Sequence, residues 1–145
     1  MPEKACEILR DFNKLDKEIG DLYHDTALKL GLSDSAFFIL YMLNDLGDGC
    51  LQKDICSECY ANKQTINSSV KKLEQQGYLT LKQGRGRDKH MFLTEVGRRF
   101  VEEKIIPVVR KENEAIMSLD PEEREEVVRL TKKYVDILKD KLGEL

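Results

Sequence analysis

The sequence has few residues that interrupt folded chains, and it has no long apolar run. It holds three prolines in 145 residues and no serine- or glycine-rich tract, which argues against long linkers. No stretch approaches the roughly 18 apolar residues that span a bilayer, and no basic segment followed by an apolar core opens the chain. We therefore expect a single domain over 1–145 that is soluble, cytoplasmic and without a membrane partner.

Metal ligands and catalytic groups are also scarce. The cysteines are Cys6, Cys50, Cys56 and Cys59, and the histidines are His24 and His90. Cys56 and Cys59 form one Cys-x-x-Cys pair without the second pair that a structural zinc site needs, so buried, unreactive thiols are the favoured interpretation. Nothing indicates secretion, so we expect no disulfide framework. Because phosphate-binding glycine loops and nucleophile–base pairs are missing too, we expect no metal, no cofactor and no enzymatic activity.

Charge is abundant but unevenly distributed. The net charge is −3, which alone disfavours a polyanionic partner. By segment, residues 1–50 carry a net −5, residues 51–100 a net +5 and residues 101–145 a net −3. The middle of the chain therefore concentrates positive charge, as a phosphate-binding surface requires, although an ordinary solvated face gives the same signal.

Apolar residues spaced by three and four predict helices in the first third of the chain. A long helix over 5–30 carries an apolar stripe on one face, formed by Ile8, Phe12, Leu15, Ile19 and Leu22. Ser33 is expected to cap a second helix, which the run Gly47-Asp48-Gly49 ends.

Two short helices and a hairpin come next. The first helix has its apolar residues four apart, at Leu51, Ile55 and Cys59. The second begins at the cap Asn62 and ends at Gly77. Between residues 78 and 93 the apolar period falls to two around a polar, glycine-containing loop over 83–88, which predicts two strands joined by that loop.

Two long helices complete the chain. Thr94 is expected to cap a helix that runs to about Leu119 and is kinked at Pro107, because proline lacks the backbone donor that an unbroken helix requires. Asp120 and Pro121 are a strong start signal for the last helix. The apolar stripe of that helix is Val127, Leu130, Tyr134, Ile137, Leu138 and Leu142.

This order of elements predicts a mainly α fold with a small β-hairpin, a winged helix-turn-helix. In the helix over 62–77, Ile66, Val70 and Leu73 anchor one side, and the exposed side chains are expected to be Lys63, Gln64, Thr65, Asn67, Ser68, Lys71 and Lys72. Such amides and hydroxyls hydrogen-bond base edges in the major groove, and no acidic residue intervenes before Glu74. We favour this groove-binding interpretation over an ordinary surface helix, which usually mixes Glu with Lys.

The hairpin adds cations beside that helix. They are Lys82, Arg85, Arg87 and Lys89, relieved only by Asp88. Arginine on a thin loop can enter a narrow minor groove, where the negative potential is greatest. A charged loop that merely blunts a sheet edge is the alternative.

Several segments carry a family resemblance. They are Gln52-Lys53-Asp54-Ile55, Asn62-Lys63-Gln64-Thr65-Ile66, Lys72-Leu73-Glu74-Gln75-Gln76-Gly77-Tyr78-Leu79 and Leu93-Thr94-Glu95-Val96-Gly97. In this order they resemble the DNA-binding core, and the junction after the wing, of the MarR family of bacterial winged helix-turn-helix regulators. The resemblance covers nearly the whole chain.

The resemblance implies a homodimeric transcriptional regulator, usually a ligand-responsive repressor, that binds a palindromic operator in double-stranded DNA. It implies a DNA-binding lobe over 33–98 flanked by dimerisation helices over 1–32 and 99–145, and it adds Lys53 and Asn62 to the DNA-contacting residues. The long apolar stripes at both ends agree with dimerisation. The family's wing has an Asp two residues before the Arg that matches Arg87; Arg85 stands there in this chain, which leaves Asp88 to steady Arg87 from the other side.

The resemblance also implies an effector. In the family, a small aromatic or phenolic ligand binds between the dimer helices and the DNA-binding lobe, and the residues expected to line such a pocket are Tyr23, His24, Phe37, Phe38 and Tyr41. Ordinary core packing is the alternative role for these side chains. Some members instead respond to oxidants through an N-terminal cysteine, a position that Cys6 occupies here. A non-enzymatic helical module that binds another protein is the remaining alternative.

Overall fold

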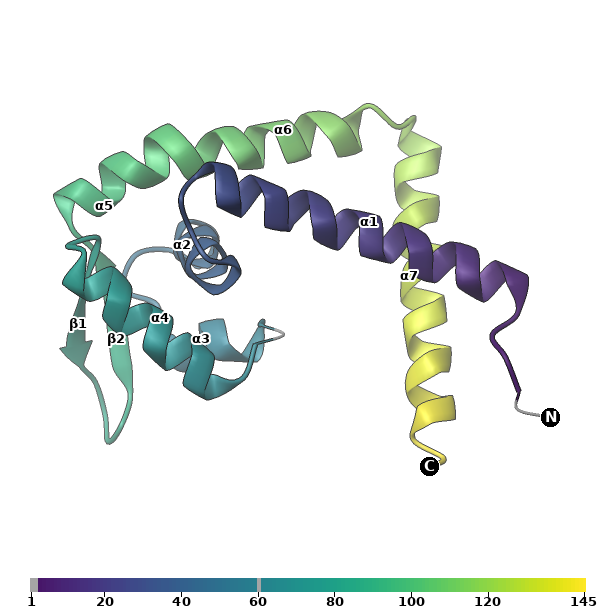
Figure 1. The fold of residues 1–145 in the computed structure, drawn as a ribbon, viewed down its shortest axis with the longest axis horizontal. Helices are drawn as coiled ribbons and strands as arrows, with labels where there is room; N and C mark the ends of the chain where they lie inside the picture. The colour runs from purple at the N-terminus through teal and green to yellow at the C-terminus, as the bar shows by residue number, and fades with distance from the viewer. Residues whose placement is uncertain (1–2, 60) are drawn as a thin grey trace. The chain divides into compact units, whose positions relative to one another are not determined.

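The computed structural model describes residues 3–59 and 61–145, which form two compact units that meet between Ile106 and Pro107. The first unit contains α1 (Glu7–Lys29), α2 (Asp34–Leu46), α3 (Gln52–Ser57), α4 (Lys63–Gln75), β1 (Leu79–Gln83), β2 (Lys89–Leu93), α5 (Glu95–Phe100) and the π-helix η1 (Val101–Ile105). The helices α6 (Ile106–Met117) and α7 (Pro121–Leu142) complete the chain (Figure 1). The predicted fold class, mainly α with one hairpin in a winged helix-turn-helix, is confirmed.

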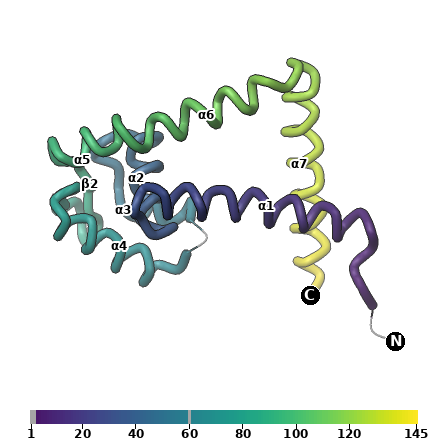
Figure 2. Tube along the Cα trace, turned by 45° about the horizontal axis from the view of Figure 1, so that its top comes forward, coloured from purple at the N-terminus to yellow at the C-terminus, as the bar shows by residue number. Residues whose placement is uncertain are grey.

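The core of the first unit is built around α2. This helix contacts α1, α3, α4 and η1, and its Ile39, Leu40 and Leu43 are almost completely buried (Figure 2). Burying each of these side chains stabilises the fold by about 1.5–3 kcal/mol. The other large side chains that are fully buried come from α3, α4, the two strands and η1, and they are Ile55, Ile66, Val70, Leu73, Leu79, Met91 and Ile105. Burial against α2 therefore determines where α3 and α4 lie.

The hairpin is tied to the loop that precedes α3. Strands β1 and β2 are antiparallel, and their register runs from Leu79 opposite Leu93 to Gln83 opposite Lys89. On the free edge of β2, the amide of Gly49 donates to the carbonyl of Met91 at 2.7 Å, and the amide of Met91 donates to the carbonyl of Cys50 at 2.9 Å. Nδ1 of His90 donates to the Gly49 carbonyl at 2.8 Å. The hairpin is thus held on both edges of β2.

The predicted helix starts are confirmed by their capping hydrogen bonds. Oγ of Ser33 accepts from the Ala36 amide at 3.1 Å, and Oδ1 of Asn62 accepts from the Thr65 amide at 2.8 Å. At the start of α5, Oγ1 of Thr94 accepts from the Gly97 amide at 3.0 Å. At the start of α7, the Asp120 amide donates to Oε1 of Glu123 at 2.8 Å. Each cap satisfies a donor that a helix end leaves without an intrahelical partner.

Two local expectations are corrected. The helix after the hairpin was expected to kink at Pro107. The structure instead has a π-helical segment, η1, that ends two residues before Pro107. Proline supplies no amide for the normal i→i−4 bond, and a wider π turn accommodates the break in register. The helix expected over Leu51–Cys59 is shorter, because the backbone of Leu51 bridges to His90 on β2 and α3 ends at Ser57.

The apolar stripes of α1 and α7 remain exposed in the single chain. Ile8 is 82% exposed and Leu22 66%, whereas Ala27 is the buried residue of α1. No residue of α6 or α7 is buried. The apolar faces that the sequence predicts on these helices are therefore left uncovered in the single chain.

Within residues 3–59 and 61–145, no single helix is long and apolar enough to cross a bilayer. Taken together, α1 and α2 pass by length and composition, but the chain bends by 90° at the break between them.

The strand-to-helix junction after the wing requires a glycine. Gly97 is buried, and a Cβ built on it lies 1.9 Å from the carbonyl oxygen of Tyr78. That same carbonyl accepts from the Thr94 amide at 3.0 Å, and the Tyr78 ring packs on Phe100 with centroids 4.9 Å apart. These contacts hold the Tyr78 backbone in place, so it cannot easily move away from a side chain at position 97.

We expect Gly97→Ala to destabilise the fold by about 2–4 kcal/mol, because the added methyl group forces a buried junction apart. Gly20→Ala is the matched control: its Cβ meets nothing within 4 Å in the middle of α1, so helix propensity predicts a gain of up to about 1 kcal/mol. Urea unfolding of both variants measures the difference. Equal stability of the two variants would contradict the junction's role.

Candidate nucleic-acid interface

The orientation of α4 follows from three buried side chains. Ile66 is fully buried, and Val70 and Leu73 are each 1% exposed. The rest of the helix consequently faces solvent, and the predicted residues that the structure exposes are Lys63, Gln64, Thr65, Ser68, Lys71 and Lys72. Amide, hydroxyl and ammonium groups therefore gather on the outer face of one helix.

The electrostatics of this face favour an anion. The first turn of α4 holds no acidic residue and begins with Lys63, and Lys71 and Lys72 follow two turns later. The unpaired amides at a helix N-terminus add a partial positive charge. In this setting a carboxylate would repel phosphate, and the first one along the helix is Glu74.

The wing lies beside this helix, since β1 contacts α4 and follows it directly in the chain (Figures 1 and 2). Its loop is ordered by two short bonds: Nε2 of Gln83 donates to the Gly86 carbonyl at 2.6 Å, and the Gly84 amide donates to the Asp88 carbonyl at 2.8 Å. Arg85, Arg87 and Lys89 are exposed on the loop and the strand that follows it. Lys82 instead lies over the Phe92 ring, 4.9 Å from its centroid.

Asp88 does not steady the wing in the way expected. Oδ2 of Asp88 pairs with Nζ of Lys53 at 3.3 Å, so its partner is on α3 rather than at the tip near Arg87. Surface pairs of this kind contribute under about 1 kcal/mol. The pair therefore orients the wing against α3 more than it stabilises the protein, and Lys53 is only partly free to meet a phosphate.

Two more of the predicted contact residues are engaged within the protein. Asn62 is the N-cap of α4, and its Oδ1 accepts from the Thr65 amide. Asn67 is half-buried, and its Oδ1 accepts a hydrogen bond from Nε2 of Gln52. Both amides keep their NH₂ groups for other partners. Sequence spacing placed these residues on the right helix but did not show that their oxygens were occupied.

Asp48 connects elements around the wing, a role that the sequence pattern did not predict. Its Oδ1 accepts from the Leu93 amide at 2.7 Å, and its Oδ2 accepts from Nη2 of Arg98 at 3.1 Å. The carboxylate thus joins the loop before α3 to the end of β2 and to α5. Nothing in the local pattern marks it, because its partners lie 45 and 50 residues away.

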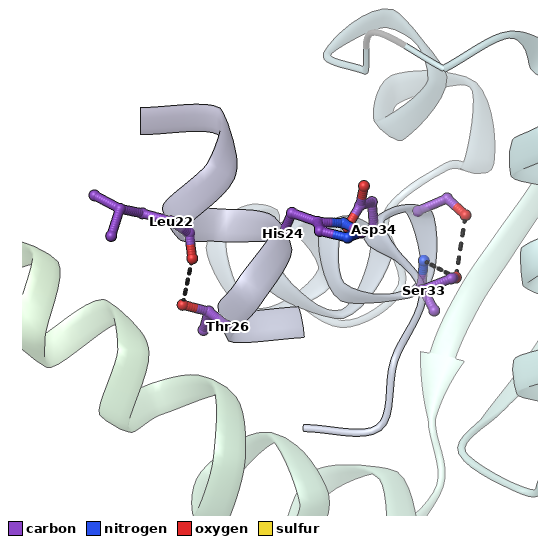
Figure 3. Close-up of polar contacts among 7 residues, drawn as sticks. Leu22, His24, Thr26, Ser33 and Asp34 are labelled. Carbon is purple, nitrogen blue, oxygen red and sulfur yellow. Dashed lines mark hydrogen bonds and ion pairs between the residues drawn. The ribbon is translucent and has the colours of Figure 1, made fainter. Parts of the chain in front are cut away.

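The predicted effector-pocket residues differ in their burial and in their contacts. Phe37 is buried in the core, and its ring lies 6.0 Å from that of Tyr41. Phe38 is half-buried and Tyr23 is 40% exposed. His24 pairs with Asp34, and Figure 3 shows the two side chains pointing toward each other from α1 and α2.

The His24–Asp34 contact is an exposed ion pair. Nδ1 of His24 lies 2.8 Å from Oδ1 of Asp34. The hydrogen bond to Asp34, and then the negative charge of Asp34, raise the pKa of His24 above its ordinary value. Asp25 and Asp21 add smaller contributions in the same direction. The contact links the end of α1 to the first turn of α2, and it is an ion pair when His24 is protonated.

Cys56 and Cys59 are half-buried rather than buried as expected. Cys6 is exposed at the start of α1, and Cys50, Cys56 and Cys59 are half-buried, all as free thiols. Burial raises the pKa of the Cys50 and Cys56 thiols, and the neighbouring Cys59 raises that of Cys56 further. Both thiols are therefore protonated at neutral pH. In the described part of the chain, no three His, Cys, Asp or Glu side chains are arranged to hold a metal ion.

The segment with this geometry has a known counterpart. Residues 30–89, which include α2, α3, α4 and most of the wing, match the model described as the MarR family. The resemblance to the MarR family is confirmed.

Whole-chain comparisons agree with this MarR-like fold. An uncharacterized HTH-type transcriptional regulator, YwoH of Bacillus subtilis, is 24% identical over 129 residues, which cover 88% of this chain and 93% of that protein. The MarR family regulator NMB1585 of Neisseria meningitidis superposes with a TM-score of 0.82 at 18% identity, covering 96% of this chain and 99% of the other.

Two further MarR-like structures were solved with bound molecules. A putative MarR family transcriptional regulator of Listeria monocytogenes, complexed with a 26mer DNA, has a TM-score of 0.70 at 20% identity, covering 94% of this chain and 92% of the other. NadR in complex with 4-hydroxyphenylacetate has a TM-score of 0.69 at 16% identity, covering 96% of this chain and 99% of the other. At these identities the structural likeness shows the fold.

The ion pair at the α1–α2 corner gives a pH-dependent prediction. Because the pKa of His24 is raised in the folded state, its contribution to stability is complete below the unfolded-state pKa, near 6.5, and is lost as pH rises through the higher folded value. Asp34→Asn should return the pKa of His24 toward 6.5, whereas Asp25→Asn, which removes a minor cause, should lower it much less. An NMR titration of the His24 ring measures both shifts, and equal shifts would refute the pairing.

Proposed function

We propose that this protein is a transcriptional regulator that binds double-stranded DNA in a sequence-specific manner. The observation that carries the proposal is the polar, acid-free outer face of α4 next to a hairpin with exposed Arg85, Arg87 and Lys89. A helix of this kind fits a major groove, and a thin arginine loop fits the adjacent minor groove or its phosphates. The MarR-like Listeria structure with bound DNA supports this assignment.

Within this proposal the contact residues divide into two roles. Gln64, Thr65, Asn67 and Ser68 lie in the first two turns of α4, where side chains reach base edges. The cationic contacts are assigned to phosphates or the minor groove, and they are Lys53, Lys63, Lys71, Lys72, Arg85, Arg87 and Lys89. Asn62 contributes its NH₂ group at the helix start, since its oxygen caps α4.

We further propose a homodimer on a palindromic operator. The exposed stripes of α1 and α7 support it, because apolar faces of this length are costly to leave in water. On α7, Val127, Val128 and Val135 line an open depression together with the polar side chains of Thr131, Lys132, Asp136 and Lys139, which leaves apolar surface for a second helix. The chain then works as one domain, with a DNA-binding lobe over 33–98 and dimerisation helices over 1–32 and 99–145.

A ligand-responsive repressor is the form of regulation proposed. The MarR-like structure of NadR with 4-hydroxyphenylacetate supports a small aromatic or phenolic effector. Tyr23 and His24 on α1, and Phe38 and Tyr41 on α2, each have at least part of their surface accessible, and we assign their rings, phenols and imidazole to contacts with such an acid. Phe37 contributes from the core.

Binding to duplex DNA should depend steeply on salt. If about six phosphates are contacted per dimer, the affinity should fall more than tenfold for each doubling of salt concentration. Fluorescence anisotropy with genomic promoter fragments, measured across a salt series, tests this. A tight complex with a protein partner that ignores salt, together with no duplex binding, would identify a protein-interaction module instead.

Wing and helix substitutions should separate affinity from sequence preference. Arg87→Ala should weaken binding to all duplexes and reduce the salt slope by about one, because it removes a backbone contact. Gln64→Ala should instead change the preferred sequence, because it removes a base contact worth about 1–3 kcal/mol of discrimination. Titration of selected and scrambled duplexes measures both. Unchanged affinity in Arg87→Ala would remove the wing from the interface.

Dimerisation should depend on α7 and not on the wing. Ile137, 49% exposed in the single chain, lies in the apolar stripe, so Ile137→Asp should weaken self-association at least about tenfold by placing a charge in the interface. Lys133→Asp puts the same new carboxylate on an exposed polar position of the same helix and should leave the dimer intact. Sedimentation equilibrium distinguishes them. An unchanged Ile137→Asp dimer would exclude this face.

A further inference from the structure

The side chain of Asn67 accepts a hydrogen bond from a residue of another helix. Gln52 is the first residue of α3, and its Nε2 donates to Oδ1 of Asn67 in the second turn of α4. Both side chains are half-buried, so the bond is partly shielded from competing water. It is a contact between two polar groups at the edge of the proposed interface.

The contact persists because both helices are fixed. Asn67 follows Ile66 and precedes Val70 by one turn, and both of those residues are buried, so α4 cannot rotate about its axis. Oγ of Ser35 on α2 is hydrogen-bonded to Oγ of Ser69, which adds a second polar tie to α4. On α3, Lys53 is paired with Asp88 on the wing. The burial of the α4 stripe, the Ser35–Ser69 bond and the Lys53–Asp88 pair therefore together fix the position of Gln52 relative to Asn67.

This bond changes what Asn67 can offer to DNA. A free asparagine presents an acceptor and a donor together, and this pair matches N6 and N7 of adenine. With Oδ1 engaged by Nε2 of Gln52, the amide NH₂ group at Nδ2, which only donates, keeps its hydrogens for an outside partner. Acceptors in the major groove are N7 and O6 of guanine and O4 of thymine, as well as N7 of adenine.

We propose that Gln52 is a specificity-determining positioning residue, which orients the Asn67 amide so that a donor faces the DNA. Asn67 then favours guanine or thymine over the two-bond contact with adenine. The inference rests on the proposed DNA-binding function and adds to it the class of base edge that this position accepts.

Gln52→Glu tests the orientation directly. A glutamate carboxylate only accepts, so the Asn67 amide must turn over, donate Nδ2 to the new side chain and present Oδ1 to the DNA. The preferred base pair at one position of each half-site should shift from acceptor edges toward the donors of adenine N6 and cytosine N4, by about five- to tenfold. Duplexes selected from a random-sequence library by each protein reveal the shift.

Matched variants isolate the effect from charge and folding. Gln75→Glu adds the same charge at the exposed end of α4 and should lower affinity without moving the preference. Asn67→Ala should remove the preference at that position in both the parent and the Gln52→Glu background. Gln52→Ala, which adds no charge, should let adenine compete and so broaden the preference even if Gln52→Glu unfolds.

The outcomes are separable. If the parent protein selects no duplex at any salt concentration, the proposed function fails. If the parent selects a sequence but Gln52→Glu and Gln52→Ala both retain the same preferred base, Gln52 does not orient Asn67 and this inference fails. A shift that disappears in the Asn67→Ala background supports it.

Discussion

Burial of one narrow stripe on α4 is the constraint from which the rest of the interface follows. Ile66, Val70 and Leu73 must pack against the α2 core, because leaving them in water costs several kcal/mol in sum. Once they are buried, the rotation of the helix is settled, and Lys63, Gln64, Lys71 and Lys72 face solvent. The chemistry of the face is thus a consequence of where three aliphatic side chains go.

Orientation of the neighbouring elements is then refined by polar contacts that are individually weak. Asp48 ties the end of β2 and α5 to the loop before α3, and Lys53 ties α3 to the wing through Asp88. Gln52 ties α3 to α4 through Asn67. Exposed or part-buried bonds like these contribute little stability, but they select one arrangement among those that the apolar core would tolerate. The short helix α3 therefore links α4 to the wing.

The helices at the two ends of the chain differ from α4 because their apolar stripes stay exposed. In α1 and α7 the apolar stripe is as regular as in α2, yet it stays exposed in the single chain. These two helices therefore still expose apolar surface whose burial would be favourable. A second copy of the chain is the partner that the proposed function supplies for them.

What the sequence determined by itself was local. The caps at Ser33, Asn62 and Thr94, and the hairpin after Gly77, were predictable because each depends on residues within a few positions of one another. The outward face of α4 was predictable because helical periodicity alone separates it from Ile66 and Val70. The tertiary structure alone decided that Gln52 meets Asn67, that Asp88 meets Lys53 and that Asp48 meets Leu93, because 15, 35 and 45 residues separate these partners and only packing around α2 brings them together.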